Sequence, residues 1–381
     1  MIAVIADDLT GAAEIAGIGL RYGLKVELTT TIDTNTDADL FVVSTDSRSL
    51  TRENAERITT QTVQAILQLK PDLIYKKIDS VLRGYVLDEL AIQMELTGLK
   101  KAFVLPANPS LGRTIKDGHY YINGKAISET GFATDPEFAI ADSSVLKMIK
   151  TMAGEERVLK QPDSLPSEGI VIGEAETPGE TAAWADKVGK DWVLAGAGDF
   201  FTALLDKQYK LATQPFVEIQ RPHLYVSGTA FEKSRAFVKS IKEQSGCVAY
   251  LPAAMVQSGN VNDTVWLEQV KSILAKQQRC IVAIHEDVSA VAALTLRATM
   301  AKAVKKIIEG IKIGELFIEG GSTAASLLSE LGITVLTTVN ELQRGVVRMK
   351  TNDLYITVKP GSYELPQQIK DLYLILPSPM I

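Results

Sequence analysis

Short apolar runs rich in β-branched residues alternate with helical patterns along the whole chain, and this alternation limits the fold more than any other feature. Alternating strands and helices of this kind form parallel sheets that are covered by helices. The sequence therefore predicts an α/β fold with mainly parallel sheets flanked by helices. The expected strands are Ile2–Ala6, Leu40–Ser44, Leu73–Lys77, Ala102–Leu105, Gly169–Ile172, Trp192–Ala195, His223–Val226, Val248–Leu251, Cys280–Ile284, Leu316–Ile318, Val335–Thr338 and Leu354–Val358, and the expected helices include Thr10–Tyr22, Arg52–Leu69, Leu87–Thr97 and Ala324–Leu331.

The chain is long enough for two domains. It has 381 residues, and a domain has roughly 100–200 residues. The segment 213–222, TQPFVEIQRP, holds two prolines, and the alternation of strands and helices restarts directly after it. We therefore expect an N-terminal domain over residues 1–218 and a C-terminal domain over residues 219–381, joined by a linker that lets the two domains close.

One insertion interrupts the alternation in the N-terminal half. Asn123-Gly124 stands between two extended stretches within His119–Ile127, and this dipeptide favours a tight type I′ hairpin turn. The stretch Ser128–Ala141 that follows has little helical or strand character. Long irregular loops inside compact domains are often functional, so we expect a functional loop here.

Composition excludes several classes of protein. The 40 basic residues are outnumbered by 46 acidic ones, a net charge of -6, whereas a duplex nucleic-acid binder needs a basic face. Two isolated cysteines and three histidines do not suit a zinc site. The N-terminus lacks the basic start of a signal peptide, and no apolar run approaches the ~20 residues of a membrane span. We expect a cytoplasmic protein that binds neither nucleic acid nor membrane.

Polar and charged residues follow the first strands of the predicted sheet. In open α/β sheets, ligands bind beyond the carboxyl ends of the strands. Carboxylates there accept hydrogen bonds from hydroxyl groups, and a guanidinium group matches a carboxylate in two places. The edge therefore suits a small, polyhydroxylated anion. Its residues are Asp7, Asp8, Thr10, Thr45, Asp46, Arg48, Lys76, Lys77, Asp79, Ser80, Arg83, Asn108, Arg113 and Thr114.

Each of these residues also has a structural interpretation. Asp8 is well placed to cap the helix that begins near Thr10. Arg83 or Arg113 alone would more often be a solvated surface residue, and Lys76 with Asp79 could form a structural ion pair.

Three glycine turns follow strands in the second half: Ser227-Gly228-Thr229, Glu319-Gly320-Gly321-Ser322-Thr323 and Lys359-Pro360-Gly361-Ser362. Glycines at a strand-to-helix turn let backbone N–H groups approach a phosphate. We therefore predict a nucleotide-phosphate cradle, with plain helix capping as the alternative. Standard fingerprints are absent, because Glu232 replaces the second glycine of a P-loop-like stretch and no GxGxxG precedes a ribose-binding acid.

Several long motifs, in order from end to end, resemble those of the four-carbon acid sugar kinase family, whose members phosphorylate threonate, erythronate or 3-oxo-tetronate. The motifs are DDLTGA at 7–12, KKIDSVLRG at 76–84, PANPSLGRT at 106–114, SETGFATDP at 128–136, GGSTA at 320–324 and KPGSY at 359–363. The resemblance implies an N-terminal domain that holds the sugar acid and a C-terminal domain that holds ATP. The nucleotide contacts it suggests are Ser227, Gly320, Gly321, Ser322, Thr323 and Gly361. The predicted phosphate cradle adds Gly228 and Lys359 to these.

A mechanism follows as a hypothesis. Phosphoryl transfer needs positioning and charge neutralisation more than covalent help. We expect Arg83 and Arg113 to hold the substrate carboxylate, and Asp7 and Asp8 to bind hydroxyl groups. Asp8 is the first candidate for the general base and Asp79 the second, and Lys77 or Lys76 would neutralise the transferring phosphoryl group. Further substrate contacts are expected from Thr10, Ser80, Asn108 and Thr114.

Magnesium is expected to arrive on the nucleotide phosphates, without a dedicated set of protein ligands. Two rival functions remain open at this point: a sugar-acid dehydrogenase, and a sugar-acid sensor that binds without catalysis. A homodimer is the default expectation for the assembly.

Overall fold

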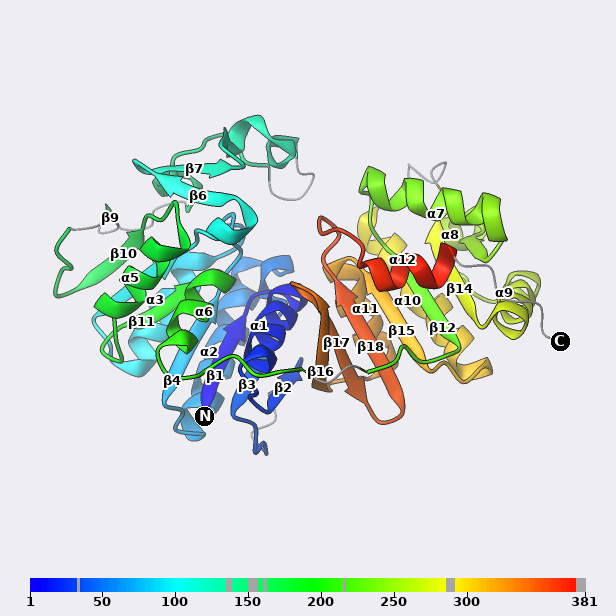
Figure 1. The fold of residues 1–381 in the computed structure, drawn as a ribbon, viewed down its shortest axis with the longest axis horizontal. Helices are drawn as coiled ribbons and strands as arrows, with labels where there is room; N and C mark the ends of the chain where they lie inside the picture. The colour runs from blue at the N-terminus through cyan, green and yellow to red at the C-terminus, as the bar shows by residue number, and fades with distance from the viewer. Residues whose placement is uncertain are drawn as a thin grey trace. The chain divides into compact units, whose positions relative to one another are not determined.

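A computed structural model of the protein describes residues 1–32, 35–134, 139–149, 157–159, 163–214, 217–285 and 292–374 (Figure 1). The chain forms two compact units, Met1–Thr213 and Gln214–Ile381. In Figure 1 the first unit runs from blue to green and the second from green to red. The division lies inside the segment 213–222 and a few residues before the predicted boundary at 218/219.

Unit 1 is built on a parallel sheet with the strand order β2-β3-β1-β4-β11-β5-β10-β9. The chain leaves β1 toward one side of the sheet and later returns to β4 on the other side. Because β3, β1 and β4 are parallel neighbours, their carboxyl ends lie side by side at the point where the chain changes direction across the sheet. The strands are β1 Ile2–Ala6, β2 Val26–Thr29, β3 Leu40–Ser44, β4 Leu73–Lys77, β5 Lys101–Leu105, β9 Arg157–Leu159, β10 Gly169–Gly173 and β11 Val193–Gly196.

Helices cover both faces of this sheet, as the alternation of side chains along a strand requires. Ala3 and Ile5 of β1 pack in one core cluster with Val63 of α2. Tyr75 of β4 points to the other face, where its ring lies 5.0 Å from that of Phe201 in α6. The main helices are α1 Leu9–Arg21, α2 Arg52–Gln68, α3 Val86–Thr97, α5 Pro178–Lys187 and α6 Gly198–Asp206.

The predicted hairpin is confirmed as part of a small antiparallel sheet in the order β6-β7-β8. Asn123 and Gly124 both have positive φ, 50° and 78°, which is the conformation that a type I′ turn needs. The strands are β6 Arg113–Lys116, β7 His119–Ile122 and β8 Lys125–Ala126, followed by the short helices η3 Ile127–Glu129 and η4 Gly131–Thr134. Residues 135–138 of the expected functional loop lie outside the described residues.

Unit 2 holds a second sheet with the order β13-β14-β12-β15-β18-β17-β16. The first five of these strands pair in parallel, whereas β18, β17 and β16 form an antiparallel meander. The strands are β12 His223–Ser227, β13 Val248–Leu251, β14 Arg279–Ile284, β15 Glu315–Glu319, β16 Val335–Gln343, β17 Val346–Thr351 and β18 Leu354–Lys359.

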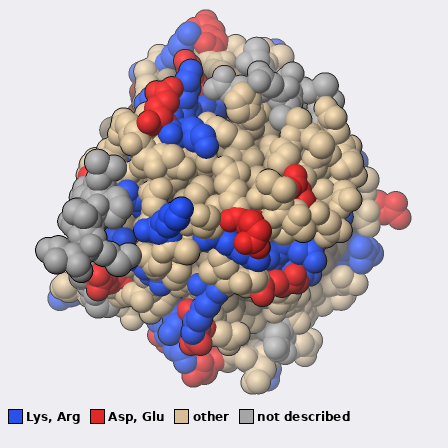
Figure 2. All heavy atoms as spheres, turned by 90° about the vertical axis from the view of Figure 1, so that its right-hand side faces the viewer, with Lys and Arg blue, Asp and Glu red and all other residues tan. Residues whose placement is uncertain are grey.

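Helices again lie on both faces. Val238 of α7 and Tyr373 of α12 share a buried cluster with Tyr225 and Phe317 of the sheet, and α10 packs against α11 elsewhere. The helices are α7 Glu232–Ser245, α8 Ala253–Ser258, α9 Thr264–Gln277, α10 Ala293–Gly310, α11 Gly321–Leu331 and α12 Gln367–Leu374. On the face drawn in Figure 2, acidic and basic side chains are interspersed, with uncharged surface between them.

A fully buried ion pair explains why the segment after the boundary belongs to unit 2. Arg348 of β17 binds both carboxylate oxygens of Glu315 at 2.8 Å. It also donates to the carbonyl oxygens of Val217, at 3.1 Å, and Glu218, at 2.9 Å. The backbone N–H of Gln220 donates to the same Glu315. Residues 217–220 are therefore fastened to unit 2.

The predicted α/β fold is confirmed, and each predicted strand is present within about two residues, except that Val335–Thr338 is the first half of the longer β16. Four strands were missed: β2, β6, β9 and β17. Both cysteines are buried free thiols. Within the described ranges, no helix is long and apolar enough to cross a membrane.

Candidate active site

The carboxyl ends of β3, β1 and β4 place a cluster of charged side chains at one edge of the unit 1 sheet. In register, Ala6 at the end of β1 lies beside Ser44 of β3 and Lys77 of β4. The residues that directly follow these three strands are therefore neighbours, although the first and the last, Asp7 and Ile78, are 71 positions apart in sequence. This confirms that the predicted strand ends meet.

Arg48, in the short helix η1 (Ser47–Ser49) after β3, lies at the centre of this cluster. Its guanidinium group binds both carboxylate oxygens of Asp7, at 2.8 and 3.1 Å. It also donates to Asp8 Oδ1 at 3.1 Å and lies 3.8 Å from Asp79 Oδ1. The sequence predicts Arg48 at this strand end, but its central position in the cluster comes from the structure alone. One cation thus serves three carboxylates.

Asp8 both caps a helix and faces the cluster. Its Oδ1 accepts a hydrogen bond from the backbone N–H of Gly11 at 2.9 Å, and its Oδ2 accepts one from the hydroxyl of Thr10. Its side chain is 17% exposed, against 5% for Asp7. The capping interpretation and the functional one are therefore compatible, because Oδ1, which caps the helix, also accepts a hydrogen bond from Arg48.

The three carboxyl groups differ in pKa because their surroundings differ. Burial raises the pKa of Asp7 above its ordinary value, even against the charge of Arg48. Burial would also raise the pKa of Asp8, but Arg48 and Lys77 outweigh it and the pKa is lowered. The pKa of Asp79 is lowered as well, because Arg83 and Arg48 together exceed the effect of burial.

Asp79, Ser80, Arg83 and Arg113 form a second group beside the first. The guanidinium group of Arg83 binds both oxygens of Asp79. Arg113, from β6 of the small sheet, donates to the hydroxyl of Ser80. The predicted structural pair of Lys76 with Asp79 is wrong, because Asp79 pairs with Arg83 instead.

Lys76 and Lys77 point to opposite faces of the sheet, as consecutive strand residues must. Lys76 is fully buried and forms an ion pair with Glu89 of α3. Lys77 lies 3.3 Å from Glu14 of α1 and donates to the carbonyl of Ile78 at 2.9 Å. Sequence reasoning missed Glu14 and Glu89, since both lie on helices where a charged residue normally faces water.

Asn108 and Thr114 occupy different positions. Asn108 is buried, and its side-chain oxygen accepts from the N–H of Asp199 at 3.2 Å. Asp199 in turn accepts from the N–H and the hydroxyl of Ser110, at 2.9 and 2.6 Å. These bonds join the turn after β5 to the first turn of α6. Thr114 lies on β6, opposite Tyr121.

In unit 2, the three predicted glycine turns follow β12, β15 and β18, whose ends are in register: Ser227 pairs with Glu319, and Glu319 with Lys359. The turns touch so closely that side chains are excluded. A Cβ atom at Gly228 would lie 2.1 Å from Thr323 Oγ1. One at Gly361 would lie 2.7 Å from Thr229 Oγ1. The structure therefore brings all three turns together.

Beneath these turns lies Glu319, a fully buried carboxylate that was missed as a functional residue. Its Oε2 accepts from Tyr225 at 2.5 Å and from Ser227 at 3.3 Å. Its Oε1 accepts from Ser234 of α7 at 2.6 Å and from Lys359 Nζ at 2.7 Å. Lys359, expected at the nucleotide, is itself fully buried in this pair.

Two further residues at these turns have clear partners. Glu364, an acid near the last turn, forms an ion pair with Lys233 of α7. Thr323 donates to the carbonyl of Gly228 at 3.3 Å, so its hydroxyl bridges two of the turns. Gly320 has φ of 105°, a conformation that favours glycine. Gly321 and Ser322 begin α11 directly after it.

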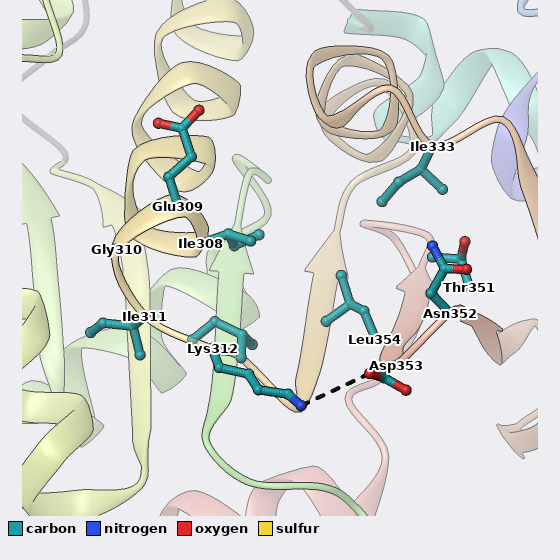
Figure 3. A pocket seen from close by; sticks show the side chains of 11 residues that line it. Ile308, Glu309, Gly310, Ile311, Lys312, Ile333, Thr351, Asn352, Asp353 and Leu354 are labelled. Carbon is teal, nitrogen blue, oxygen red and sulfur yellow. Dashed lines mark ion pairs between the residues drawn. The ribbon is translucent and has the colours of Figure 1, made fainter.

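A cavity of ≈ 500 Å³ lies at the amino ends of β15 and β18, the end of the sheet opposite to the glycine turns. Figure 3 shows its lining, which comes from the segments that precede β15 and β18 and from Ile333. Lys312 and Asp353 face one another across it at 3.9 Å. The glycine turns lie at the carboxyl ends of these strands, so this cavity is not part of the candidate site. Among the described residues, no three acidic, histidine or cysteine side chains are grouped to hold a metal.

Comparison with known proteins assigns a kind of domain to each unit. A family model described as a sugar-binding N-terminal domain matches residues 2–204, and one described as a nucleotide-binding C-terminal domain matches residues 224–363. The chain is 24% identical to a D-threonate kinase of Salmonella typhimurium over 94% of each chain. It is 22% identical to a 3-oxo-tetronate kinase of Brucella melitensis, over 95% of this chain and 92% of that one.

Two more similarities agree with these. A D-erythronate kinase of Heliobacterium modesticaldum is 29% identical over 39% of this chain and 35% of its own. A solved protein of Haemophilus influenzae has the same fold, with a TM-score of 0.77 and 17% identity, over 97% of this chain and 98% of that one.

The substitution Asp79→Asn should make the free energy of unfolding less dependent on pH in the acid range. The pKa of Asp79 lies below its ordinary value of 3.8 in the folded protein. A carboxyl group of this kind stabilises the fold above its unfolded-state pKa, and that stability is lost as the pH falls toward the folded-state pKa. The variant should therefore be less stable at pH 7, with a difference that shrinks below about pH 4. Urea unfolding from pH 7 to 3 measures this, and a constant difference would contradict it.

Proposed function

This chain belongs to the four-carbon acid sugar kinase family, and from that premise we propose that it transfers the terminal phosphoryl group of ATP, with Mg²⁺, to a hydroxyl group of a four-carbon sugar acid. Family membership favours this over a dehydrogenase or a sensor. The observation that carries the assignment of the substrate site is the charged edge after β3, β1 and β4, where guanidinium groups and carboxylates alternate within 4 Å.

The substrate carboxylate is assigned to Arg113 and Arg83. A guanidinium group can bind a carboxylate in two places, and these two come from different elements of unit 1. The hydroxyl groups are assigned to Asp7 and Asp8 with Thr10 and Ser80 around them. Asn108 and Thr114 complete the set of proposed substrate-binding residues, with Asn108 acting through its bond to the N–H of Asp199.

Asp8 is the stronger candidate for the general base. Both oxygens of Asp79 are bound by the charged guanidinium group of Arg83, whereas Oδ2 of Asp8 accepts from the neutral hydroxyl of Thr10. Asp8 is the more exposed of the two, at 17% against 8%. Lys77, whose charge lowers the pKa of Asp8, is assigned to neutralise the transferring phosphoryl group. Because Lys76 is buried against Glu89, we assign it a supporting role.

The nucleotide is assigned to the turns after β12, β15 and β18. Closely packed glycine turns leave backbone N–H groups to approach phosphates, and the proposed contacts are Ser227, Gly228, Gly320, Gly321, Ser322, Thr323 and Gly361. Lys359 is assigned to support these turns from below through Glu319. Since Glu319 already accepts four hydrogen bonds, it does not suit a magnesium ligand, and we assign Mg²⁺ to the phosphate oxygens, whose charge it would neutralise.

The first test is a kinase assay of the purified chain with ATP, Mg²⁺ and a panel of acids. The panel contains D- and L-threonate, D- and L-erythronate and the 3-oxo-tetronates. We expect one acid to be turned over with a mass gain of one phosphate group and matching release of ADP. ATP binding without turnover of any acid would contradict the proposed substrate class, and absence of ATP binding would contradict the donor.

Asp8→Asn should abolish most of the turnover while the protein stays folded. The amide oxygen still caps α1 through the N–H of Gly11, but it cannot accept a proton. Loss of a general base typically costs about 10²–10⁴-fold in rate. Steady-state kinetics measures turnover, and calorimetry with ATP checks that nucleotide affinity is kept. Turnover near that of the natural chain would remove Asp8 from this role.

Gly228→Ala should weaken ATP binding by about tenfold or more, because forcing a carbon into closely packed atoms costs roughly 1–3 kcal/mol. The added Cβ would meet Thr323 at 2.1 Å, which displaces one turn of the cradle. Affinity for the sugar acid should not change. Gly310→Ala is the matched control, since it faces only the flexible end of Lys271. Calorimetry with ATP measures both, and equal affinities would contradict the cradle.

A further inference from the structure

Phe132 lies against both arginines that we assign to the substrate carboxylate. The guanidinium carbon of Arg83 is 5.7 Å from the centre of the Phe132 ring, and that of Arg113 is 6.0 Å from it. The two arginines come from the turn after β4 and from β6, whereas Phe132 comes from η4. Three segments of unit 1 therefore converge on one aromatic ring.

The ring is held by a well-anchored segment. Ile127, at its start, is fully buried, and the hydroxyl groups of Ser128 and Ser143 are 2.8 Å apart. The carbonyl of Phe132 accepts a hydrogen bond from the N–H of Ile140 at 3.0 Å. These contacts hold the backbone of the segment that carries Phe132, so the position of its ring is defined by the fold.

The two arginines differ in how much of their charge is already matched. Arg83 binds both oxygens of Asp79. Among the described residues, Arg113 has no carboxylate within ion-pair distance, and its hydrogen-bond partner is the neutral hydroxyl of Ser80. An aromatic face attracts a guanidinium group without neutralising it. Phe132 can thus hold Arg113 in place and leave its charge for a ligand.

We propose that Phe132 is a positioning residue for carboxylate recognition: its ring orients Arg113, and with it Arg83, toward the acid group of the substrate. This rests on the proposed function, which supplies the carboxylate. It makes the segment 127–133 a wall of the sugar-acid site and assigns a purpose to the insertion that interrupts the strand–helix alternation. Guanidinium stacking on the ring orients the donors before the substrate arrives, which reduces the cost of binding.

Two substitutions distinguish the effect of the aromatic face of Phe132 from the effect of its size. Phe132→Leu keeps an apolar side chain of similar size and removes the aromatic face, whereas Phe132→Tyr keeps that face. We expect the leucine variant to raise KM for the sugar acid and the calorimetric Kd for D-threonate or D-erythronate by roughly 3- to 30-fold. Its kcat and its KM for ATP should change by less than about twofold. The tyrosine variant should restore the affinity for the acid.

A merely structural role predicts a different pattern. If Phe132 only packs, the leucine and tyrosine variants should bind the acid equally well, and this result would overturn the proposal. So would a leucine variant that lowers kcat and raises both KM values together with a lower Tm.

Arg113→Lys distinguishes failure of this inference from failure of the proposed site. If Arg113→Lys weakens binding of the acid and Phe132→Leu does not, the carboxylate site stands and the role of Phe132 is refuted. If neither variant changes the affinity for the acid, the assignment of the carboxylate to Arg113 fails, and the inference about Phe132 fails with it.

Discussion

The charge of Arg48 is the constraint on which the edge of the unit 1 sheet depends. Asp7, Asp8 and Asp79 are brought together by strand register alone, and three buried carboxylates so close would repel one another strongly. The single guanidinium group that reaches all three offsets this repulsion. Removing one partner of a buried ion pair typically costs about 3–5 kcal/mol. Arg48 acts together with Lys77 to lower the pKa of Asp8, and together with Arg83 to lower the pKa of Asp79.

In unit 2 the buried charge at the strand ends is a single carboxylate, which is satisfied by three hydroxyl groups and one ammonium group. Here one buried anion, Glu319, collects donors from β12, α7 and β18. Strand register again decides the arrangement, because Ser227, Glu319 and Lys359 lie side by side. Lys359 is paired with Glu319, so the two buried charges beneath the turns neutralise one another. Recognition of phosphates then falls to backbone N–H groups, which is why glycines crowd these turns.

Strands that are buried on both faces could be predicted from the sequence because their apolar runs are continuous. β17 could not, since Arg348 stands in its middle. That arginine is buried only because Glu315, 33 positions earlier, pairs with it, and a tertiary partner at such a separation leaves no local pattern. β2 is only four residues long and carries Glu27, so it does not read as a buried run.

The site divides in the same way. Residues that follow strands could be found, because the carboxyl edge of a parallel sheet is where ligands bind. Their partners could not, since Glu14 and Glu89 lie on helices. The alternation of side chains along β4 already implies that Lys76 and Lys77 face opposite sides, so that Lys76 alone turns toward α3. What the sequence lacks is the identity of the acid that each lysine meets.

The balance of charges at the unit 1 edge explains why the small antiparallel sheet is needed. Arg48 is matched by Asp7 and Asp8, Arg83 by Asp79, and Lys77 lies near Glu14. A site whose cations are all matched internally attracts an anion weakly. Among the described residues, these three are the cations that the strand ends of the parallel sheet bring to the carboxylate cluster. Arg113 arrives from β6, outside the strand–helix alternation, and meets a hydroxyl group and an aromatic ring where the other cations meet carboxylates. The small antiparallel sheet thus adds a positive charge, Arg113, that is not paired with a carboxylate of the described residues.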